Sequence, residues 1–596
     1  MRGTNSTLIG NIKSISGNRI SIQLDEKMKS IMPIINGILY KVGQIGSFIK
    51  IPLGFTNLYG LVIQIGADAL PESFKKIALE ERIDMQFTTR WISAVLIGET
   101  LINNFERGVT QFPNVEDEVH LVTLEDLEII YGGLEEKNSI TIGNISVSES
   151  LPAKIDIDKI LTRHTALVGS TGSGKSNAVT VILNAISKKT EFNSSRILVI
   201  DPHGEYSSSL KENSQVFKIN ADSGKEEMEL QIPFWALPFE ELLYSFTGKL
   251  SDTQNDYLRE KILELKKASS KFLIPIPSEA SITVDSPIPF SIKQLWFDLD
   301  DFERQTFSDT VRTTKTSLSQ KGDADNLISN IYELATTTNT APFFNNRAKG
   351  ILNFLESVRN RLIDKSYSFL FEPKDYKPSL DGKCTSDLDK LLECWLGSDK
   401  SITILDLSGI PSEILTSISG TVLKIIYDAL FWSQNLHVGG RKQPLLIVLE
   451  EAHNYLKAGK ESISSRTVQA ISKEGRKYGL GILLVTQRPS ELDDTVLSQC
   501  GTMIALRMYN SSDRSHVTSA IQDDLNNITD LLPSLRTGEA LIIGEGVKIP
   551  SRVKFYKMPD SPKSSDPKVS IEWAKDKPDV KEYSKAVEFW RDKKFT

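Results

Sequence analysis

The sequence predicts an α/β protein in which a small β-barrel precedes a parallel sheet that is interrupted by a helical insertion. Short β-rich runs separated by glycine fill the first 150 residues, strand and helix signals alternate from about residue 151, and helical patterns dominate between 207 and 399. Alternating strands and helices favour a parallel sheet. The expected domains are a barrel (1–150), a core (151–206 and 400–559), a helical insertion (207–399) and a linker with a tail helix (560–596).

The predicted barrel rests on runs of β-branched and aliphatic residues that are bounded by turn residues. These runs lie at 20–24, 48–51, 61–65 and 91–97. Because these short β-rich runs are separated by glycine, we expect a small β-barrel domain.

The predicted core begins with a strand at 165–168 and an amphipathic helix at 176–186. Further strand signals follow the insertion, at 402–407, 445–449, 481–485 and 502–506. Within the insertion, apolar residues at helical spacing mark 258–266 and 351–359. The insertion therefore separates strands that we expect to share one sheet.

The segment Gly169-Ser-Thr-Gly-Ser-Gly-Lys-Ser176 matches the phosphate-loop pattern G-x-x-x-x-G-K-[ST] at every fixed position. Glycines allow consecutive backbone N–H groups to surround phosphate oxygens at the positive end of the next helix. An ordinary glycine-rich turn is the alternative, which the flanking strand and helix disfavour. We expect Lys175 on the β- and γ-phosphates of ATP and Ser176 on Mg²⁺. The full set expected to bind nucleotide here is Gly169, Ser170, Thr171, Gly172, Ser173, Gly174, Lys175, Ser176 and Asn177.

Two carboxylates, Glu450 and Glu451, directly follow the predicted strand at 445–449. The carboxyl end of a neighbouring strand is where a phosphate-loop ATPase needs acidic groups. We expect Glu450 to act in the water shell of Mg²⁺ and Glu451 to orient and polarise the attacking water. The alternative is that acidic residues simply favour the first turn of a helix.

Two other strands also end in polar residues. Asp201-Pro-His-Gly-Glu-Tyr206 follows the strand at 197–200, which makes Asp201 and Glu205 candidates to support the nucleotide site. A turn built by proline and glycine is the alternative. Gln487 follows the strand ending at Val485 and is a candidate to sense the γ-phosphate or hold the water, with a plain strand cap as the alternative.

Arg476 lies in the basic segment Lys473-Glu-Gly-Arg-Lys-Tyr-Gly479, just before the strand at 481–485. A basic residue at a protomer edge can reach a neighbour's nucleotide, so Arg476 is a candidate to act in trans. The same residues also suit a solvated helix end.

Composition limits the classes of protein that remain. The chain has 596 residues, a formal net charge of −7 and 25 % charged residues. These values are ordinary for a soluble protein and argue against coating nucleic acid with the whole surface, so we expect any DNA contact to be local. Apolar runs are too short to span a bilayer and the N-terminus lacks the pattern of a signal peptide, so we expect a cytoplasmic location. Cys384, Cys394 and Cys500 are expected to be reduced structural thiols.

Together, the phosphate loop, Asp201 to Tyr206, Glu450-Glu-Ala-His-Asn-Tyr455, Glu474 to Gly479 and Val485-Thr-Gln-Arg-Pro489 resemble the HerA branch of the FtsK/HerA ATPases. The resemblance implies an N-terminal HAS-type barrel and a RecA-like core. It also implies a hexameric ring that hydrolyses ATP with Mg²⁺ to move double-stranded DNA through its pore. In this family Arg476 would be the trans arginine, and Arg163 would contact nucleotide at a subunit interface. Glutamate stands at position 450 where many relatives carry aspartate.

The resemblance further implies a partner protein, because relatives act beside a nuclease or a Sir2-like effector in DNA end processing or in bacterial defence against phage. We expect such a partner on the barrel face. The alternative function is an ATP-loaded ring that activates its partner without processive movement. A transport or conjugation ATPase is disfavoured because the sequence shows no membrane segment. Candidate DNA contacts in the insertion are Lys249, Arg312, Lys315, Arg347 and Lys349, with scattered solvated charge on helices as the alternative for each.

Overall fold

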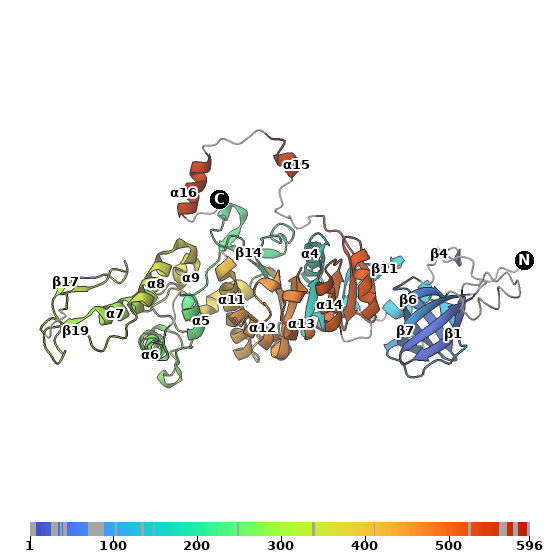
Figure 1. The fold of residues 1–596 in the computed structure, drawn as a ribbon, viewed down its shortest axis with the longest axis horizontal. Helices are drawn as coiled ribbons and strands as arrows, with labels where there is room; N and C mark the ends of the chain where they lie inside the picture. Colours follow the sequence, from blue (N-terminus) through green and yellow to red (C-terminus); the bar gives the residue numbers. More distant parts are fainter. Residues whose placement is uncertain are drawn as a thin grey trace, which may run out of the picture.

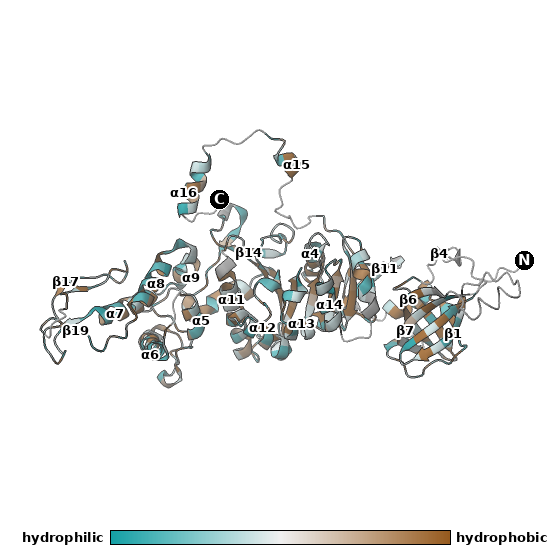
Figure 2. Cartoon of the chain, in the orientation of Figure 1, coloured by the Kyte–Doolittle hydropathy of each residue, from teal (hydrophilic) through white to brown (hydrophobic). Residues whose placement is uncertain are grey.

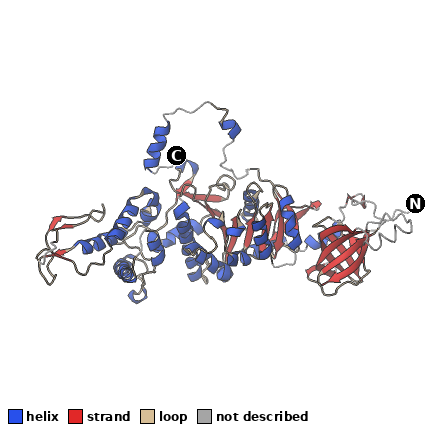
Figure 3. Cartoon of the chain, viewed as in Figure 1, coloured by secondary structure: helices blue, strands red, loops and turns tan. Residues whose placement is uncertain are grey.

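The computed structural model describes residues 7–25, 34–35, 38–39, 44–68, 89–101, 104–132, 136–146, 148–246, 250–335, 340–410, 412–521, 526–559, 569–575 and 582–592. The barrel lies at one end of an elongated molecule, the large sheet is central and the helical insertion is at the other end (Figures 1 and 3). Lys249 and the predicted linker at 560–567 lie outside the described residues.

The N-terminal strands close into an antiparallel barrel, as the sequence predicts. The order is β2-β1-β9-β5-β6-β7, and pairing between β2 and β7 completes the circle, while β8 extends β7. Its interior is filled by aliphatic side chains such as Ile12, Ile22, Ile51 and Leu58, all fully buried. The strands are β1 (Leu8–Ser16), β2 (Arg19–Leu24), β5 (Phe48–Leu53), β6 (Thr56–Asp68), β7 (Thr89–Leu101), β8 (Asn104–Arg107) and β9 (Glu118–Leu121); a small pair, β3 (Ile34–Ile35) and β4 (Ile38–Leu39), is separate.

The core is a mixed sheet of 12 strands in the order β11-β10-β25-β24-β23-β12-β22-β21-β13-β20-β14-β15. The strands from β23 to β15 run parallel, and the rest are antiparallel. The bounds are β10 (Ser139–Ile145), β11 (Ser148–Asp156), β12 (Thr165–Val168), β13 (Arg196–Asp201), β14 (Ser214–Lys218), β15 (Glu227–Glu229), β20 (Ile402–Asp406), β21 (Leu445–Leu449), β22 (Leu480–Thr486), β23 (Thr502–Leu506), β24 (Glu539–Gly544) and β25 (Ser551–Phe555).

The central strands β12, β13, β20, β21, β22 and β23 are buried at every residue. Figure 2 shows hydrophobic residues gathered on these strands and more hydrophilic colour over the insertion. Burial on both faces is what a parallel sheet covered by helices requires. The sheet therefore supplies the rigid frame for the loops at its two edges.

Two predicted domain boundaries differ from the structure. Strand β10 begins at Ser139 and pairs with β25 and β11, so the strand residues 139–145 and 148–150 belong to the core sheet and not to the barrel. Strands β14 and β15 lie within the predicted helical insertion, yet they extend the core sheet beyond β20. Both differences arise because open strand edges of the core take partners from flanking sequence.

Helices cover the sheet and link it to the insertion. Around the core they are α2 (Leu124–Gly132), α3 (Ile157–Thr162), α4 (Lys175–Ile186), α11 (Ser412–Trp432), α12 (Ile463–Glu474), α13 (Asp494–Ser498) and α14 (Ser511–Ala520). Among the described residues, one segment, Ile414–Trp432, has the length and hydropathy of a membrane span, and 56 % of it is buried. Gly420 of this helix lies against Ile463 and Ser464, so close packing on α12 explains its apolar character.

The insertion is mainly helical and is built around aromatic side chains. Phe234 meets Phe290 edge-on with ring centroids 5.5 Å apart, and Phe246 stacks on Phe371 at 5.5 Å. Its elements are α5 (Phe239–Tyr244), α6 (Asp252–Ser269), α7 (Ile292–Arg304), β16 (Thr306–Phe307), β17 (Leu318–Gln320), β18 (Ile331–Tyr332), β19 (Phe343–Phe344), α8 (Leu352–Ile363), α9 (Ser368–Phe371) and α10 (Leu388–Leu396). The tail holds α15 (Val569–Glu572) and α16 (Glu582–Asp592).

Candidate nucleotide-binding site

The glycine-rich loop joins the end of β12 to the start of α4. Gly172 and Gly174 have φ values of 72° and 105°, a region that other residues rarely adopt. A Cβ at Gly169 would lie 2.7 Å from Ser173 Oγ and 2.8 Å from Leu506 Cβ. The glycines of the pattern are therefore required by the backbone itself.

Neighbouring strands hold the loop open. Ser170 N donates to Arg507 O at 2.9 Å, and Gly538 N donates to Ser173 O at 2.8 Å. Because these bonds use groups outside the loop, its shape does not depend on a bound ligand. A preformed cradle of this kind binds an anion without a large ordering cost.

Lys175 opens α4 and is only 8 % exposed. Its Nζ donates to Ser170 O at 3.4 Å. Burial lowers the pKa of Lys175, while the charges of Glu451, Glu450 and Glu205 oppose that shift. A buried ammonium with one long hydrogen bond is ready to accept an anionic ligand.

Asp201 ends β13 and builds the turn that follows it. Its Oδ1 accepts from Gly204 N at 2.8 Å and its Oδ2 accepts from Tyr206 N at 3.1 Å. Burial raises the pKa of Asp201 to about 6. The turn places Glu205 so that its Oε2 accepts from Ser176 Oγ at 2.7 Å. Asp201 thus shapes the site, and Glu205 touches the phosphate loop.

Glu450 follows β21 and is almost fully buried. Its Oε2 accepts a hydrogen bond from the Tyr206 hydroxyl at 2.6 Å, and its carbonyl oxygen accepts one from the Tyr455 hydroxyl at 2.5 Å. Burial raises the pKa of Glu450 to about 8, with the nearby charges of Asp201, Glu451 and Glu205 adding to the rise. The raised pKa therefore favours the protonated form of this carboxyl group near neutral pH.

Glu451 lies beside Glu450 in a strained left-handed conformation, with φ of 48°. Its Oε2 lies 3.3 Å from His453 Nδ1, within ion-pair distance. Among the described residues, no donor is aligned well enough to form a hydrogen bond to this oxygen. Burial alone would raise the pKa of Glu451, yet His453 and the charge of Lys175 bring it below its ordinary value. The pKa values of the two adjacent glutamates are thus shifted in opposite directions, and Glu451 is the one that favours the ionised form.

Gln487 follows β22, the strand next to β12. Its Oε1 accepts from Thr171 Oγ1 of the phosphate loop at 2.5 Å. Thr486 Oγ1 lies 3.1 Å from His453 Nδ1, which links this strand end to the residues after β21. The sheet therefore brings Lys175, Ser176, Glu205, Glu450, Glu451 and Gln487 together at its carboxyl edge.

Asn177 does not face the loop as a free nucleotide ligand. Its Nδ2 donates to Tyr556 O at 2.8 Å, and its Oδ1 accepts from Met558 N at 3.1 Å. Both polar groups of this side chain are used to fasten the chain after β25. The side chain of Asn177 therefore acts as an anchor for that segment, and a nucleotide contact of this residue through its backbone N–H stays a prediction.

Arg163 and Arg476 lie at the opposite edge of the sheet. Arg163 precedes β12, which has 4 residues, and Arg476 precedes β22, which has 7. The strands therefore separate them from the carboxyl edge by about 13 Å and about 23 Å respectively. Arg163 Nε lies 3.5 Å from Glu545 Oε2, at a cleft of about 300 Å³. Arg476 is exposed, and within the described residues its guanidinium has no ion pair or hydrogen bond. Neither arginine reaches the site of its own chain.

Comparison with known proteins decides the family. Residues 140–426 match the family described as Helicase HerA, central domain, and residues 419–572 match Helicase HerA-like C-terminal. The chain belongs to the HerA-type P-loop ATPases. This HerA-type chain is therefore an ATPase of the helicase and DNA-translocase class.

The curated relatives extend this match over most of the chain. The DNA double-strand break repair helicase HerA of Pyrococcus furiosus is 26 % identical over 454 residues, which cover 72 % of this chain and 71 % of that protein. The protein of the same name from Sulfurisphaera tokodaii is 25 % identical over 554 residues, or 92 % and 96 % of the two chains. Among solved structures, VirB4 of Thermoanaerobacter pseudethanolicus is 16 % identical, covers 72 % of this chain and 98 % of its own, and gives a TM-score of 0.45.

The sequence alone assigned no role to several residues that the structure places in this HerA-type site. Tyr206, His453 and Thr486 lie inside the polar motifs that mark the strand ends, so their positions were a signal. Arg507 was not marked by any motif, because its contact with the phosphate loop depends on β23 lying beside β12.

The oxygen donors of the site suit Mg²⁺ by their chemistry. Within the described ranges, no group of three or more His, Cys, Asp or Glu side chains could hold a metal. The site instead offers the Ser176 hydroxyl and the carboxylates of Glu205, Glu450 and Glu451. Mg²⁺ commonly keeps several waters and binds through few protein oxygens together with substrate phosphates, so these residues fit it.

Proposed function

We propose that the protein is a hexameric, ATP-driven motor that moves double-stranded DNA and acts in the cytoplasm. The observation that carries this proposal is the division of the site between two edges of one sheet. Groups suited to bind and hydrolyse a nucleoside triphosphate gather at the carboxyl edge, while Arg163 and Arg476 lie at the amino edge. One chain therefore holds both parts of the site but cannot use them on the same nucleotide.

The carboxyl edge suits hydrolysis of ATP. The N–H groups from Gly169 to Ser176 surround the phosphates, and Lys175 neutralises charge on the β- and γ-phosphates. Glu451 accepts the proton of a water whose oxygen attacks the γ-phosphorus, and the bond to the β-phosphate oxygen breaks to give ADP and phosphate. Gln487 orients that water once its side chain has released the hydrogen bond from Thr171.

Mg²⁺ would be held by Ser176 and the ATP phosphates, with Glu450 in its water shell, and would neutralise charge that develops on the phosphates. Glu205, which accepts from Ser176 in the structure, keeps that hydroxyl oriented toward the cradle. The raised pKa of Glu450 means that a cation must draw it into its charged form.

The position of the arginines supports the proposed ring. A head-to-tail contact places the amino edge of one subunit against the carboxyl edge of the next, and such contacts close into rings. Arg476 would then stabilise charge on the neighbour's γ-phosphate, and Arg163 would contact the same nucleotide at the interface. The assignment of six subunits rests on the resemblance to HerA-type rings.

The substrate and partner are proposed from the family and from the surface. The relatives are named as helicases for repair of DNA double-strand breaks, and we extend DNA movement to this chain. The barrel exposes apolar side chains, among them Phe55, Leu101, Phe112 and Val115, which suit a protein partner. That partner is a nuclease or Sir2-like effector, in antiviral defence or DNA end processing.

The test is ATP hydrolysis by the full chain with and without linear duplex DNA, with the mass of the assembly measured in the same buffer. The proposal expects a hexamer whose turnover rises with DNA, and a Lys175→Ala variant that is inactive. A stable ring that binds ATP and ignores DNA would overturn the motor and favour the scaffold that activates its partner.

A further inference from the structure

An exposed loop at residues 457–461, with the sequence Lys-Ala-Gly-Lys-Glu, follows Glu450 and Glu451 in the chain. We call it the coupling loop. Gly459 has φ of 71°, which lets the chain reverse within these few residues. Neither Lys457 nor Lys460 has an ion pair or side-chain hydrogen bond within the described residues. Two ammonium groups are thus presented at the same edge of the sheet as the nucleotide site.

The coupling loop is joined to the glutamates by a short and buried connection. Tyr455 is 1 % exposed, and its hydroxyl donates a hydrogen bond to Glu450 O at 2.5 Å. Asn454 N donates to Glu451 O at 2.9 Å, and Leu456 N donates to Ala452 O at 2.9 Å. A shift of the loop therefore displaces the backbone that sets the position of Glu451.

The same loop is also joined to the segment after Gln487. Ala458 N donates to Glu491 O at 2.9 Å, and Asp493 N donates to Leu456 O at 3.2 Å. That segment follows the end of β22, where Arg488 N donates to Thr486 Oγ1 at 3.0 Å. The coupling loop is hydrogen-bonded to segments adjoining both residues that we assign to the attacking water, Glu451 and Gln487.

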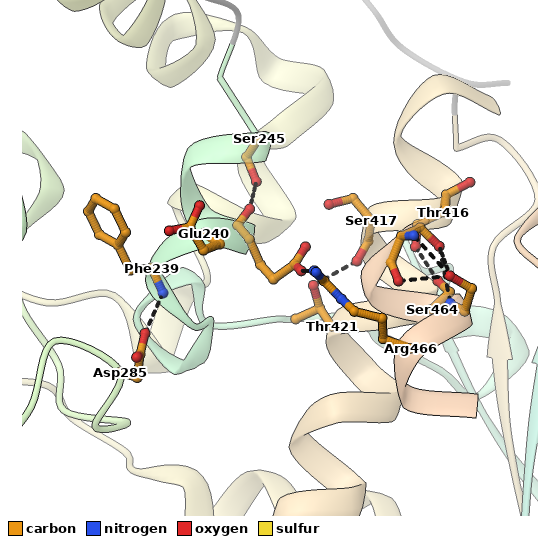
Figure 4. A network of polar contacts seen from close by, with 12 residues as sticks. Phe239, Glu240, Ser245, Asp285, Thr416, Ser417, Thr421, Ser464 and Arg466 are labelled. Atoms are coloured by element: carbon orange, nitrogen blue, oxygen red, sulfur yellow. Dashed lines mark hydrogen bonds and ion pairs between the residues drawn. The ribbon is translucent and has the colours of Figure 1, made fainter. Parts of the chain in front are cut away.

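The coupling loop forms one rim of a cleft of about 590 Å³ between the core and the insertion. Across the cleft, Arg466 of α12 pairs with Glu241 of α5, and Figure 4 shows Arg466 reaching toward that helix. On the same lining, Arg361 donates to the Tyr367 hydroxyl, and Arg259 pairs with Glu240 at the rim.

Charge at the rim is mixed, because Glu240, Glu241 and Glu461 also line the cleft. Glu240 and Glu241 have cationic partners already, whereas the two lysines do not. Glu461 in the loop and the charge of Glu491, which acts on Lys457, offset part of the positive charge of the two lysines. Within the described residues, Lys457 and Lys460 are nevertheless the exposed cations of this lining that have neither an ion pair nor a side-chain hydrogen bond. Backbone phosphates are the part of duplex DNA that such lysines bind without regard to sequence.

We propose that the coupling loop is the DNA-sensing contact of this ATPase, in which Lys457 and Lys460 bind backbone phosphates of duplex DNA and the loop then repositions Glu451 and Gln487. This inference rests on the proposed function. It assigns the DNA contact that controls turnover to the core, and not to the basic residues of the insertion.

The experiment measures ATP turnover of the full-length protein against the concentration of linear duplex DNA, at several salt concentrations. The test variant is Lys457→Ala/Lys460→Ala, and Lys457→Arg/Lys460→Arg keeps the charge. A matched control, Lys321→Ala/Lys365→Ala, removes two exposed lysines of the insertion that have no ion pair within the described ranges.

We expect the alanine pair to keep basal turnover, ATP binding and assembly mass, and to lose at least about tenfold in stimulation by DNA. Its salt slope for DNA binding should fall by about 1 to 2, as expected for the loss of two phosphate contacts. The arginine pair should respond like the natural protein, and so should the control pair.

Two results would overturn the inference while leaving the motor intact. One is full DNA stimulation of the alanine pair in the coupling loop. The other is loss of stimulation in the insertion pair alone. If DNA fails to stimulate the unaltered protein, the proposed function fails first and this inference falls with it.

Discussion

The hydroxyl of Tyr206 donates a 2.6 Å hydrogen bond to Glu450 Oε2, so the turn after β13 is tied directly to the first of the two glutamates after β21. This bond favours the charged carboxylate, since it lowers the pKa of Glu450 against the large effect of burial. A residue outside the phosphate loop therefore controls how readily Glu450 ionises.

Replacing Tyr206 with phenylalanine should leave Glu450 buried without its donor. We expect the pKa of Glu450 to rise further, so that the rise of kcat with pH moves to a higher pH. Stability should fall by about 1–3 kcal/mol, the usual cost of an unpaired buried polar group. Steady-state ATPase rates from pH 6 to 9 and thermal unfolding check both points. Tyr583→Phe, at an exposed ring of α16, is the control.

Glu451→Gln should remove the base but keep the shape of the site. We expect turnover to fall by roughly 100-fold or more, the scale of a lost general base. ATP binding should stay, because Lys175 and the loop are unchanged, whereas Lys175→Ala should lose it. Equilibrium binding of a fluorescent ATP analogue beside turnover separates the two. Normal turnover in Glu451→Gln would assign the base to another residue.

Subunits that carry different defects should rescue one another if arginines act in trans. Lys175→Ala and Arg476→Ala proteins are each expected to be inactive. After mixing and subunit exchange, a Lys175 site can meet an intact Arg476 from its neighbour, so a measurable fraction of turnover should return. Mixed assemblies that remain as inactive as either parent would contradict the trans role.

Asn177→Ala should act on stability and not on nucleotide affinity. The variant loses two hydrogen bonds to the chain after β25, which we expect to cost about 2 kcal/mol. The KM for ATP should change by less than about twofold. Thermal unfolding and the KM are measured together. A large loss of ATP affinity with unchanged stability would restore Asn177 as a nucleotide ligand.

His164 gives a pH-dependent stability that is separate from the catalytic groups. It is buried before β12, and its Nδ1 accepts from Ile482 N at 3.2 Å. Burial lowers the pKa of His164 to about 4. The unfolded chain therefore binds more protons between about pH 6.5 and 4, and stability falls as the pH drops through that range.

His164→Asn tests this point, because asparagine retains an acceptor and tolerates the φ of 51° found here. The free energy of unfolding of the variant should fall less steeply than that of the natural protein as the pH drops. The two proteins should differ in this loss by at most about 3 kcal/mol across the range. Thermal midpoints from pH 4 to 7 give the comparison. Parallel curves for the two proteins would show that His164 does not set the acid limb.

Some features of the site could be predicted because they depend on neighbours in sequence. Gly172 and Gly174 are dictated by local backbone geometry, and Glu450 and Glu451 follow a strand whose apolar pattern is plain. The barrel, the parallel core and the P-loop order were predicted for the same reason. Strand and turn signals depend on residues that are close in the chain, so they can be recognised from the sequence alone.

Other features could not be predicted, because they arise between segments that are far apart in the chain. Asn177 and Tyr556 meet only because β25 returns beside the start of α4. The sequence predicts a helical insertion over the residues of β14 and β15, whereas β14 pairs with β20 and β15 pairs with β14, so both strands belong to the sheet. No local pattern encodes which edge of a sheet will be open.

By itself, the sequence predicted a glycine loop suited to a phosphate-bearing ligand and placed acidic and amide groups at strand ends. The tertiary structure decided which of these groups meet. Parallel register brings Ser176 to Glu205, Thr171 to Gln487 and Tyr206 to Glu450, and it sends Arg163 and Arg476 to the far edge. The reason is physical: strand direction fixes the edge at which each loop emerges, and only the assembled sheet defines that direction.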